Sequence, residues 1–454
     1  RSTTDHFTID ESGNVGIGTA TPTDYHASAD DLVIATSGST GITIVSGTTS
    51  QGNIFFADGT SGSAEYAGFV QCLHGSSNLL KLGVNGENKL ILDTDSRISL
   101  SNNDSSGAVG TTLLGYKAGL SIVSGAIQNT FIGHEVSDAT MTSGADYNTA
   151  VGASSMSALT SGTQNTAHGM NSLHRVTSGS YNTAIGVASL EDITTTSNNT
   201  AVGRQSGFYS VGADNTYIGY QSGLGSDGSG ADNHNTAVGS SSLFSVTDGA
   251  GNTVMGSTAG DAITTESNCT LIGQFAGSGI NSADANGSTA VGNTALWKNT
   301  SGRYNTAIGF QSLAQNLIGD SCTALGYQAL TSSLGNDNTA IGYLAGTALT
   351  SGASNTMLGS YAGDAMTTSN DNVGIGLNAI GQATTQTDRV VAIGSGAMGG
   401  GISTADITGL VSIGYEALAG SLQATTDYTV AIGYQALKTL TSGEKNIAIG
   451  FESQ

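Results

Sequence analysis

A short motif recurs twenty times between residues 111 and 454, and this repeat restricts the possible folds more than any other feature of the chain. Its clearest copies read Asn-Thr-Ala-Ile-Gly, as at 182–186, 305–309 and 338–342. The closing glycines are spaced by 16 to 20 residues, with a mean period of about 17.6 residues. A unit of this length cannot bury an apolar face alone, so consecutive units must stack on one another.

The residue types within the motif predict a β-solenoid. The residue before the glycine is apolar in nineteen copies, with His168 as the exception, and Asn fills the first position in thirteen. In a strand, Thr and Ile share one face while Asn and Ala share the other. The glycine makes a turn, a second short strand follows, and a Thr-Ser-Gly segment makes another turn. We therefore predict an all-β fold with a parallel β-roll of about twenty coils over residues 111–454.

Stacked coils would form a rod on the order of 95 Å long at the usual strand spacing. Asn side chains in register would form amide ladders along it. Six of the closing glycines are predicted to be structural turn residues: Gly186, Gly203, Gly309, Gly326, Gly342 and Gly433.

The small Asn and Ala face is expected to be exposed on a single roll and to pack against two other copies in a parallel homotrimer. The Thr and Ile face would then point into the roll, so His168 would take an inward position. This makes His168 a packed neutral side chain or, as a weak candidate, a metal ligand near the threefold axis.

Residues 1–110 lack the repeat and read as a smaller β-rich shaft or hairpin module. Apolar alternation at 7–10 and 15–18 flanks the turn sequence Glu-Ser-Gly-Asn, which predicts a hairpin. Further short strands are expected at 32–35, 41–45, 53–57, 79–84, 89–92 and 97–100.

The repeat resembles the head repeat of trimeric autotransporter adhesins, on the match of Asn182-Thr183-Ala184-Ile185-Gly186 and Ser189 to their Asn-Ser-x-Ala-Ile-Gly coils. The resemblance implies a left-handed parallel β-roll. The N-terminal segments Ile9–Gly18 and Gly52–Thr60 resemble bacteriophage tail-fibre proteins. Both families are trimeric, which implies a homotrimer here. The adhesin stalk and membrane anchor have no counterpart in this sequence, and its coils are longer and more variable than those of adhesin heads.

Composition disfavours several function classes. Thirty-four acidic and twelve basic residues give a net charge of −22, which disfavours nucleic-acid binding because phosphate contacts need clustered Lys and Arg. No run of about 18 apolar residues occurs, so no membrane insertion is expected. The three cysteines form no metal-binding pattern. We expect no catalytic residues, no cofactor and no enzyme activity, although carboxylates brought together between coils could still hydrolyse a glycoside.

Four residues are possible ligand-facing positions: Trp297, Tyr304, Asp227 and Asp232. The insertions at 224–234, 281–287 and 402–409 are expected to project from one side of the rod, where binding surfaces usually lie. The favoured function is a structural fibre protein, such as a phage tail fibre or other virion appendage, that acts in host attachment. Its expected partners are itself, other virion tail proteins and a host surface glycan or receptor. A bacterial surface adhesin or extracellular filament subunit and, third, a polysaccharide-degrading spike remain alternatives.

Overall fold

The computed structural model describes residues 7–19, 21–24, 31–35, 40–60, 65, 67–74, 79–92, 98–100, 110–226, 232–282, 285–383, 386–401, 406–423 and 426–454. The chain divides into two compact units, Arg1–Ser101 and Asn102–Gln454, a division slightly earlier than the expected one at residue 110. The fold is all-β, as predicted. A short 3-10 turn lies at Pro22–Asp24.

The first unit begins with a three-stranded sheet. The strands β1 (Thr8–Ile9) and β2 (Val15–Ile17) pair antiparallel, and β2 pairs parallel with β3 (Leu32–Ile34). The hairpin expected from the sequence is present because Asp10 organises its turn. The Asp10 carboxylate accepts hydrogen bonds from the backbone amides of Ser12 and Asn14, both at 2.9 Å.

A five-stranded antiparallel meander completes the first unit. Its strands are β4 (Gln51–Phe56), β5 (Gly68–Leu73), β6 (Leu79–Val84), β7 (Glu87–Leu92) and β8 (Ile98–Leu100).

The two faces of this meander differ in polarity. The register places Ile54 beside Val70 and Leu82 on one face, and Asn53 beside Gln71 and Lys81 on the other. On the apolar face, Ile54 is 46% exposed and Leu82 is 40% exposed. The apolar face of this sheet is therefore largely uncovered within the single chain.

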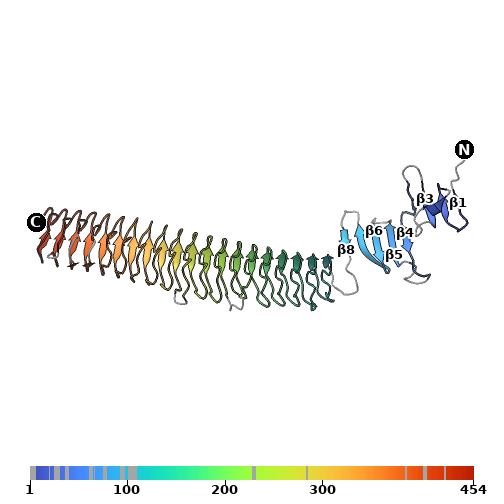
Figure 1. Cartoon of the computed structure of the whole chain (residues 1–454), viewed down its shortest axis with the longest axis horizontal. Helices are drawn as coiled ribbons and strands as arrows, with labels where there is room; N and C mark the ends of the chain where they lie inside the picture. Colours follow the sequence, from blue (N-terminus) through green and yellow to red (C-terminus); the bar gives the residue numbers. More distant parts are fainter. Residues whose placement is uncertain are drawn as a thin grey trace. The chain divides into compact units, whose positions relative to one another are not determined.

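The second unit is a parallel β-solenoid, which confirms the central prediction. Twenty strands pair in sequence order and in register, so that Thr183 of one strand lies opposite Thr200 of the next. Figure 1 shows them one behind another, from teal at β9 to red at the C-terminus. A separate parallel pair joins β25 (Thr387–Asp388) to β27 (Ile407–Thr408). The twenty strands are β9 (Thr112–Leu114), β10 (Thr130–Ile132), β11 (Thr149–Val151), β12 (Thr166–His168), β13 (Thr183–Ile185), β14 (Thr200–Val202), β15 (Thr216–Ile218), β16 (Thr236–Val238), β17 (Thr253–Met255), β18 (Thr270–Ile272), β19 (Thr289–Val291), β20 (Thr306–Ile308), β21 (Thr323–Leu325), β22 (Thr339–Ile341), β23 (Thr356–Leu358), β24 (Val373–Ile375), β26 (Val391–Ile393), β28 (Val411–Ile413), β29 (Val430–Ile432) and β30 (Ile447–Ile449).

The prediction of a second strand after each closing glycine is wrong. This return segment is a chain of turns in which non-glycine residues adopt left-handed backbone angles, as at Ala188 (φ 57°) and Leu190 (φ 49°). These angles aim the amides at different coils: Ala188 donates to the carbonyl of Met170 in the preceding coil, and Leu190 donates to that of Ser206 in the following one. The return segment therefore keeps inter-coil hydrogen bonds without the extended backbone of a strand.

The predicted orientation of the strand faces is also wrong. The central residue of each strand, such as Ala184, is completely buried, and Asn182 is buried beside it. Ile185 instead points outward and is 42% exposed. The interior of a coil is instead filled by the small strand residue together with large side chains from after the glycine, such as Leu190 and Ile193, which are both fully buried. The small residues line the interior of the roll and do not form an external packing surface.

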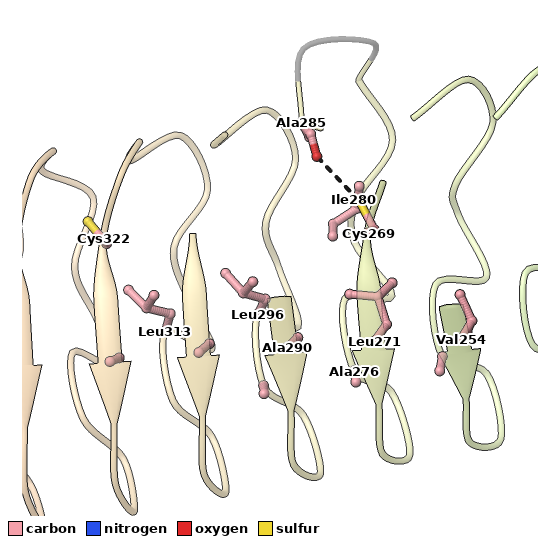
Figure 2. Close-up of a cluster of buried hydrophobic side chains, with 14 of the residues drawn as sticks. Val254, Cys269, Leu271, Ala276, Ile280, Ala285, Ala290, Leu296, Leu313 and Cys322 are labelled. Carbon is pink, nitrogen blue, oxygen red and sulfur yellow. Dashed lines mark hydrogen bonds between the residues drawn. The ribbon is translucent and has the colours of Figure 1, made fainter. Parts of the chain in front are cut away.

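In most coils one large core side chain comes from either the strand or the return segment. In seven of the twenty coils a strand Ala is combined with a Leu six residues later, as with Ala184 and Leu190. Where the strand carries a large residue, the later position is usually glycine, as with Leu271 and Gly277. A Cβ atom on Gly277 would lie 2.7 Å from Leu271 Cδ2, closer than real Cβ contacts. Figure 2 shows both solutions side by side, with Leu271 on one strand and Leu296 opposite Ala290 in the next coil.

The expected ladder of asparagines joins the coils, but it is buried inside the roll and not exposed on its surface. The backbone amide of Asn182 donates to Asn165 Oδ1 at 3.0 Å, and its Nδ2 donates to the carbonyl of Thr196 at 3.0 Å. Cys269 and Cys322 occupy the same slot and interrupt this ladder, because each has a thiol in place of the amide (Figure 2).

A second ladder on the outer turn was not foreseen. The backbone amide of Thr163 donates to Ser180 Oγ in the next coil, and that of Ser180 donates to Ser197 Oγ, both at 3.0 Å. In the inner ladder each coil donates to the preceding one, whereas here each coil donates to the following one. The two ladders therefore run in opposite directions along the stack.

Candidate binding surfaces

The six glycines predicted to be turn residues lie at the same corner of their coils. Their φ angles are positive, from +132° at Gly186 to +145° at Gly342, a region that strongly favours glycine. A Cβ atom at Gly309 would lie 2.3 Å from the carbonyl oxygen of Gly326 in the next coil. Each closing glycine thus permits both the turn and the close approach of successive coils.

The outward strand face forms an apolar stripe along the rod, and we call it the strand stripe. It consists of the residues before the closing glycines, such as Ile185, Met255 and Leu358, which are 42%, 50% and 43% exposed. Thr side chains lie beside them on the same face. Large exposed apolar surfaces are uncommon on monomeric soluble proteins.

His168 belongs to the strand stripe and not to the interior. It is exposed at the end of β12, in register with Val151 and Ile185. The prediction that it points inward is therefore wrong, for the same reason that Ile185 points outward. Among the described residues, no group of three or more His, Cys, Asp or Glu side chains could hold a metal ion.

An aromatic ladder follows the corner just after the closing glycines. The rings of Tyr327 and Tyr343 stack with centroids 5.2 Å apart, as do those of Tyr415 and Tyr434. These rings remain 43–46% exposed at one edge. The recurrence of Tyr at this position therefore corresponds to a stacked surface ladder between coils.

Asp232 is wrong as a ligand-facing candidate, because it is only 1% exposed. Its carboxylate accepts hydrogen bonds from the Tyr217 hydroxyl at 2.5 Å, from Ser210 Oγ at 2.9 Å and from the Gly212 amide at 2.9 Å. Burial raises the pKa of Asp232 to about 6. Tyr217 fills a strand centre that is usually Ala, so a carboxylate was needed as partner for its buried hydroxyl. The sequence did not indicate that Asp232 and Tyr217 form a pair. Its one relevant feature is that Tyr217 occupies a strand position that is Ala in most coils.

The other ligand-facing candidates have different placements. Trp297 and Tyr304 are 43% and 64% exposed, in the return segment and the outer turn of consecutive coils. Asp227 lies outside the described residues, as do parts of the three insertions, namely 227–231, 283–284 and 402–405. Of the three candidates that the structure describes, Asp232 is buried in the core, whereas Trp297 and Tyr304 are on the surface.

The cysteine thiols show no features of reactive groups. Burial raises the pKa of the Cys322 thiol to about 11 and also raises that of Cys269. Reactive cysteines need a lowered pKa and access to solvent. Both residues act as small buried side chains in the asparagine slot.

Comparison of the chain with protein-family models, curated proteins and solved structures finds no match. Across the residues placed by the structure, no helix is long and apolar enough to cross a membrane.

Proposed function

We propose that this chain is a structural fibre protein that acts in host-cell attachment, as a phage tail fibre or similar virion appendage. The observation that carries the proposal is the uninterrupted register of the solenoid, in which each strand from β9 to β30 in the main stack pairs with the next over equivalent residues. Such a stack grows by nearest-neighbour contacts into a stiff rod. A long rod of uniform width can hold a binding site at a distance from the particle that carries it. The protein would lie on a virion or another extracellular structure.

A parallel homotrimer is the assembly that we propose for this fibre. The strand stripe supports this trimer. The Asn and Ala face, which the sequence suggested as the trimer interface, lies inside the roll and is not available for assembly. Three copies can bury their stripes around one axis, with each coil in contact with its equivalents, because Ile185, Ile218 and their counterparts recur at one coil spacing. The largely uncovered apolar face of the β4–β8 meander would be buried by the same association.

Light scattering tests this assembly. We expect a mass three times that of the 45.2 kDa chain. Substitution of Ile185 and Ile308 by Asp should weaken the trimer, because it places charges in the buried stripe. The matched control is Ile318→Asp, which replaces another exposed isoleucine (60%) outside the strands. A stable 45.2 kDa monomer under native conditions would contradict the trimer.

Attachment is assigned to the insertions and the return segments, since the strand positions serve stacking and assembly. Many weak sites on a trimer would act together through avidity. Partners would be a host surface glycan or receptor at these sites and other virion tail proteins at the attachment to the particle. Deleting 227–231 and 402–405, which spares the buried Asp232, should reduce adsorption to host cells without loss of assembly. Unchanged adsorption would mean that the chain serves only as a spacer and does not bind the host cell.

A bacterial surface adhesin or extracellular filament is the second candidate. The observation that favours it is the similarity of the Asn-Thr-Ala-Ile-Gly coils to adhesin-head coils, now with the alanine and asparagine inside the roll. Gene neighbourhood separates the two, since virion genes support the fibre and a secretion system supports the adhesin. A polysaccharide-depolymerase assay tests the remaining alternative of a degrading spike.

A further inference from the structure

Trp297 is the single tryptophan of the chain and forms one wall of a shallow groove on the return side of the solenoid. The groove has a volume of about 340 Å³ and crosses three consecutive coils. Its lining residues are Ser278, Gly279, Asn281, Trp297, Lys298, Thr300 and Leu317. It lies in return segments, not on the strand stripe, so it is separate from the surface assigned to assembly.

The indole does not belong to the aromatic ladder. Rings of that ladder stack on rings of neighbouring coils, as Tyr327 does on Tyr343. The positions equivalent to Trp297 in the adjacent coils are Ser278 and Ala314, which are too small to cover its faces. Trp297 is 43% exposed. An aromatic face left open beside polar groups is suited to the apolar face of a pyranose ring.

Polar groups surround the indole. Lys298 Nζ lies over one face of the indole ring, 5.1 Å from its centroid, and takes part in no ion pair within the described residues. A sugar ring would therefore contact the opposite face of the indole. The side chains of Asn281 and Ser278 make no hydrogen bond with any described residue. An amide, a hydroxyl and an ammonium are therefore free to bind a ligand at the rim of the groove.

The charge at the rim indicates the class of ligand. The other described lysines of the solenoid, Lys117, Lys438 and Lys445, each form an ion pair with a glutamate, whereas Lys298 does not. The nearby Arg303 is engaged by Asp320 at 2.8 Å, which leaves Lys298 as the cation of the groove. A carboxylate on the sugar would take the place of the missing acidic partner.

We propose that this groove binds an acidic polysaccharide, with a pyranose ring against Trp297 and a sugar carboxylate near Lys298. The assignment rests on the proposed attachment function and names its ligand class. Single-site affinity is expected to be weak because the groove is open, and repetition on an oligomer would compensate.

The single tryptophan makes the test direct. The full-length protein is titrated with trigalacturonate and with the neutral galactotriose while tryptophan fluorescence is recorded. We expect a saturable change with both sugars at different midpoints, with trigalacturonate about two- to fivefold tighter at low salt. Lys298→Gln should remove this preference and keep the response to the neutral sugar. No saturable change with either sugar would overturn the site, and equal midpoints would overturn the carboxylate assignment.

Calorimetry with Trp297→Ala completes the test, because that variant lacks the fluorophore. Loss of the aromatic wall should weaken binding at least about tenfold. The control is Tyr181→Ser, which removes an exposed ring (55%) in another coil, outside the groove, and should bind as the parent does. Unchanged binding by Trp297→Ala would overturn the site. Neither experiment needs host cells or an assembled trimer, so the two proposals fail separately. Absence of sugar binding would contradict the groove but not the fibre proposal. Unchanged adsorption of the loop-deletion variant would contradict the assignment of attachment to the loops but not the groove.

Discussion

The coils with an asparagine ladder and the last coils of the solenoid form the same stack by different means. From Asn129 to Asn372 the slot before the strand is mainly Asn, whereas the corresponding residues of the next three coils are Val390, Leu410 and Thr429, and the final coil has Asn446. The strands β24, β26, β28 and β29 also begin with Val in place of Thr. Strand pairing and register are nevertheless the same in both regions.

Two features replace the inner ladder in the later coils. Leu410, together with Ile407, is buried in the core, so apolar packing fills the slot that the amide occupied. The outer ladder continues: the Asn370 amide donates to Asp388 Oδ1 at 2.7 Å, and the Thr408 amide donates to Asp427 Oδ1 at 2.9 Å. The glycine turn and the filled core are therefore common to all coils. The inner asparagines are one of two ways to keep the strands in register, and apolar packing in the same slot is the other.

The largest effect is expected from the feature that both regions share. Gly309→Val and Gly414→Val should each destabilise by about 4 kcal/mol or prevent folding, because a Cβ would meet the next coil's carbonyl oxygen at 2.3 Å and 2.2 Å. Circular dichroism during thermal unfolding measures this. If only one of the two variants were destabilised, the regions would not share a common turn.

The second largest loss of stability is expected from a reduction of core volume, and it should be equal in both regions. Leu190→Ala and Leu418→Ala each leave a cavity in a layer of the roll, since both leucines are fully buried. We expect a loss of about 3 kcal/mol in each, measured by denaturant unfolding.

A matched double variant tests the reciprocal arrangement of the core. Leu190→Gly with Ala184→Leu reproduces the pattern of Leu271 and Gly277. It should be more stable than Leu190→Gly alone. A double variant no better than the single one would contradict the exchange of volume within a coil.

The asparagine slot should distinguish the regions. Asn182→Leu removes an acceptor for the Asn199 amide, at 3.0 Å, and a donor for the Thr196 carbonyl, so about 2 kcal/mol should be lost. Val390→Asn should cost less, because the new amide could extend the ladder from Asn372. Equal losses would mean that the slot plays the same part throughout the stack.

The smallest effect concerns the polar core site of the ladder region. The pKa of Asp232 is about 6 in the folded protein against an unfolded value near 3.9, so the folded state binds more protons between these values. Stability contributed by this group is therefore highest below pH 4 and falls as pH rises to 6, by about 2 kcal/mol. Asp232→Asn should abolish this component in a comparison of unfolding free energies at pH 4 and pH 7. An unchanged difference would show that another group titrates.

The repeat predicted the fold well because its glycine and its alternation are local properties. The period, the number of coils and the position of Cys269 in the asparagine slot follow from spacing alone. The face of the strand that points inward did not follow, since alternation of Ala and Ile fixes two faces but not which one lies inside. That choice depends on the width of the coil, which is set by the left-handed residues of the return segment.

The candidate sites were harder to predict for the same reason. Asp232 reads as an exposed loop carboxylate until the buried hydroxyl of Tyr217 is placed beside it. The groove at Trp297 depends on small residues in neighbouring coils, Ser278 and Ala314, whose proximity arises only on stacking. A comparison of the side-chain sizes at equivalent positions of adjacent coils would have indicated this groove from the sequence.

The reciprocal pairing of large and small core residues bears on how such a chain can change over generations. Ala184 and Leu190, like Leu271 and Gly277, lie within a single coil. Duplication or loss of one whole coil by unequal recombination therefore carries both members of the pair together. Length can then vary in steps of one coil, and a coil with an exposed tryptophan can be copied or moved without repacking its neighbours.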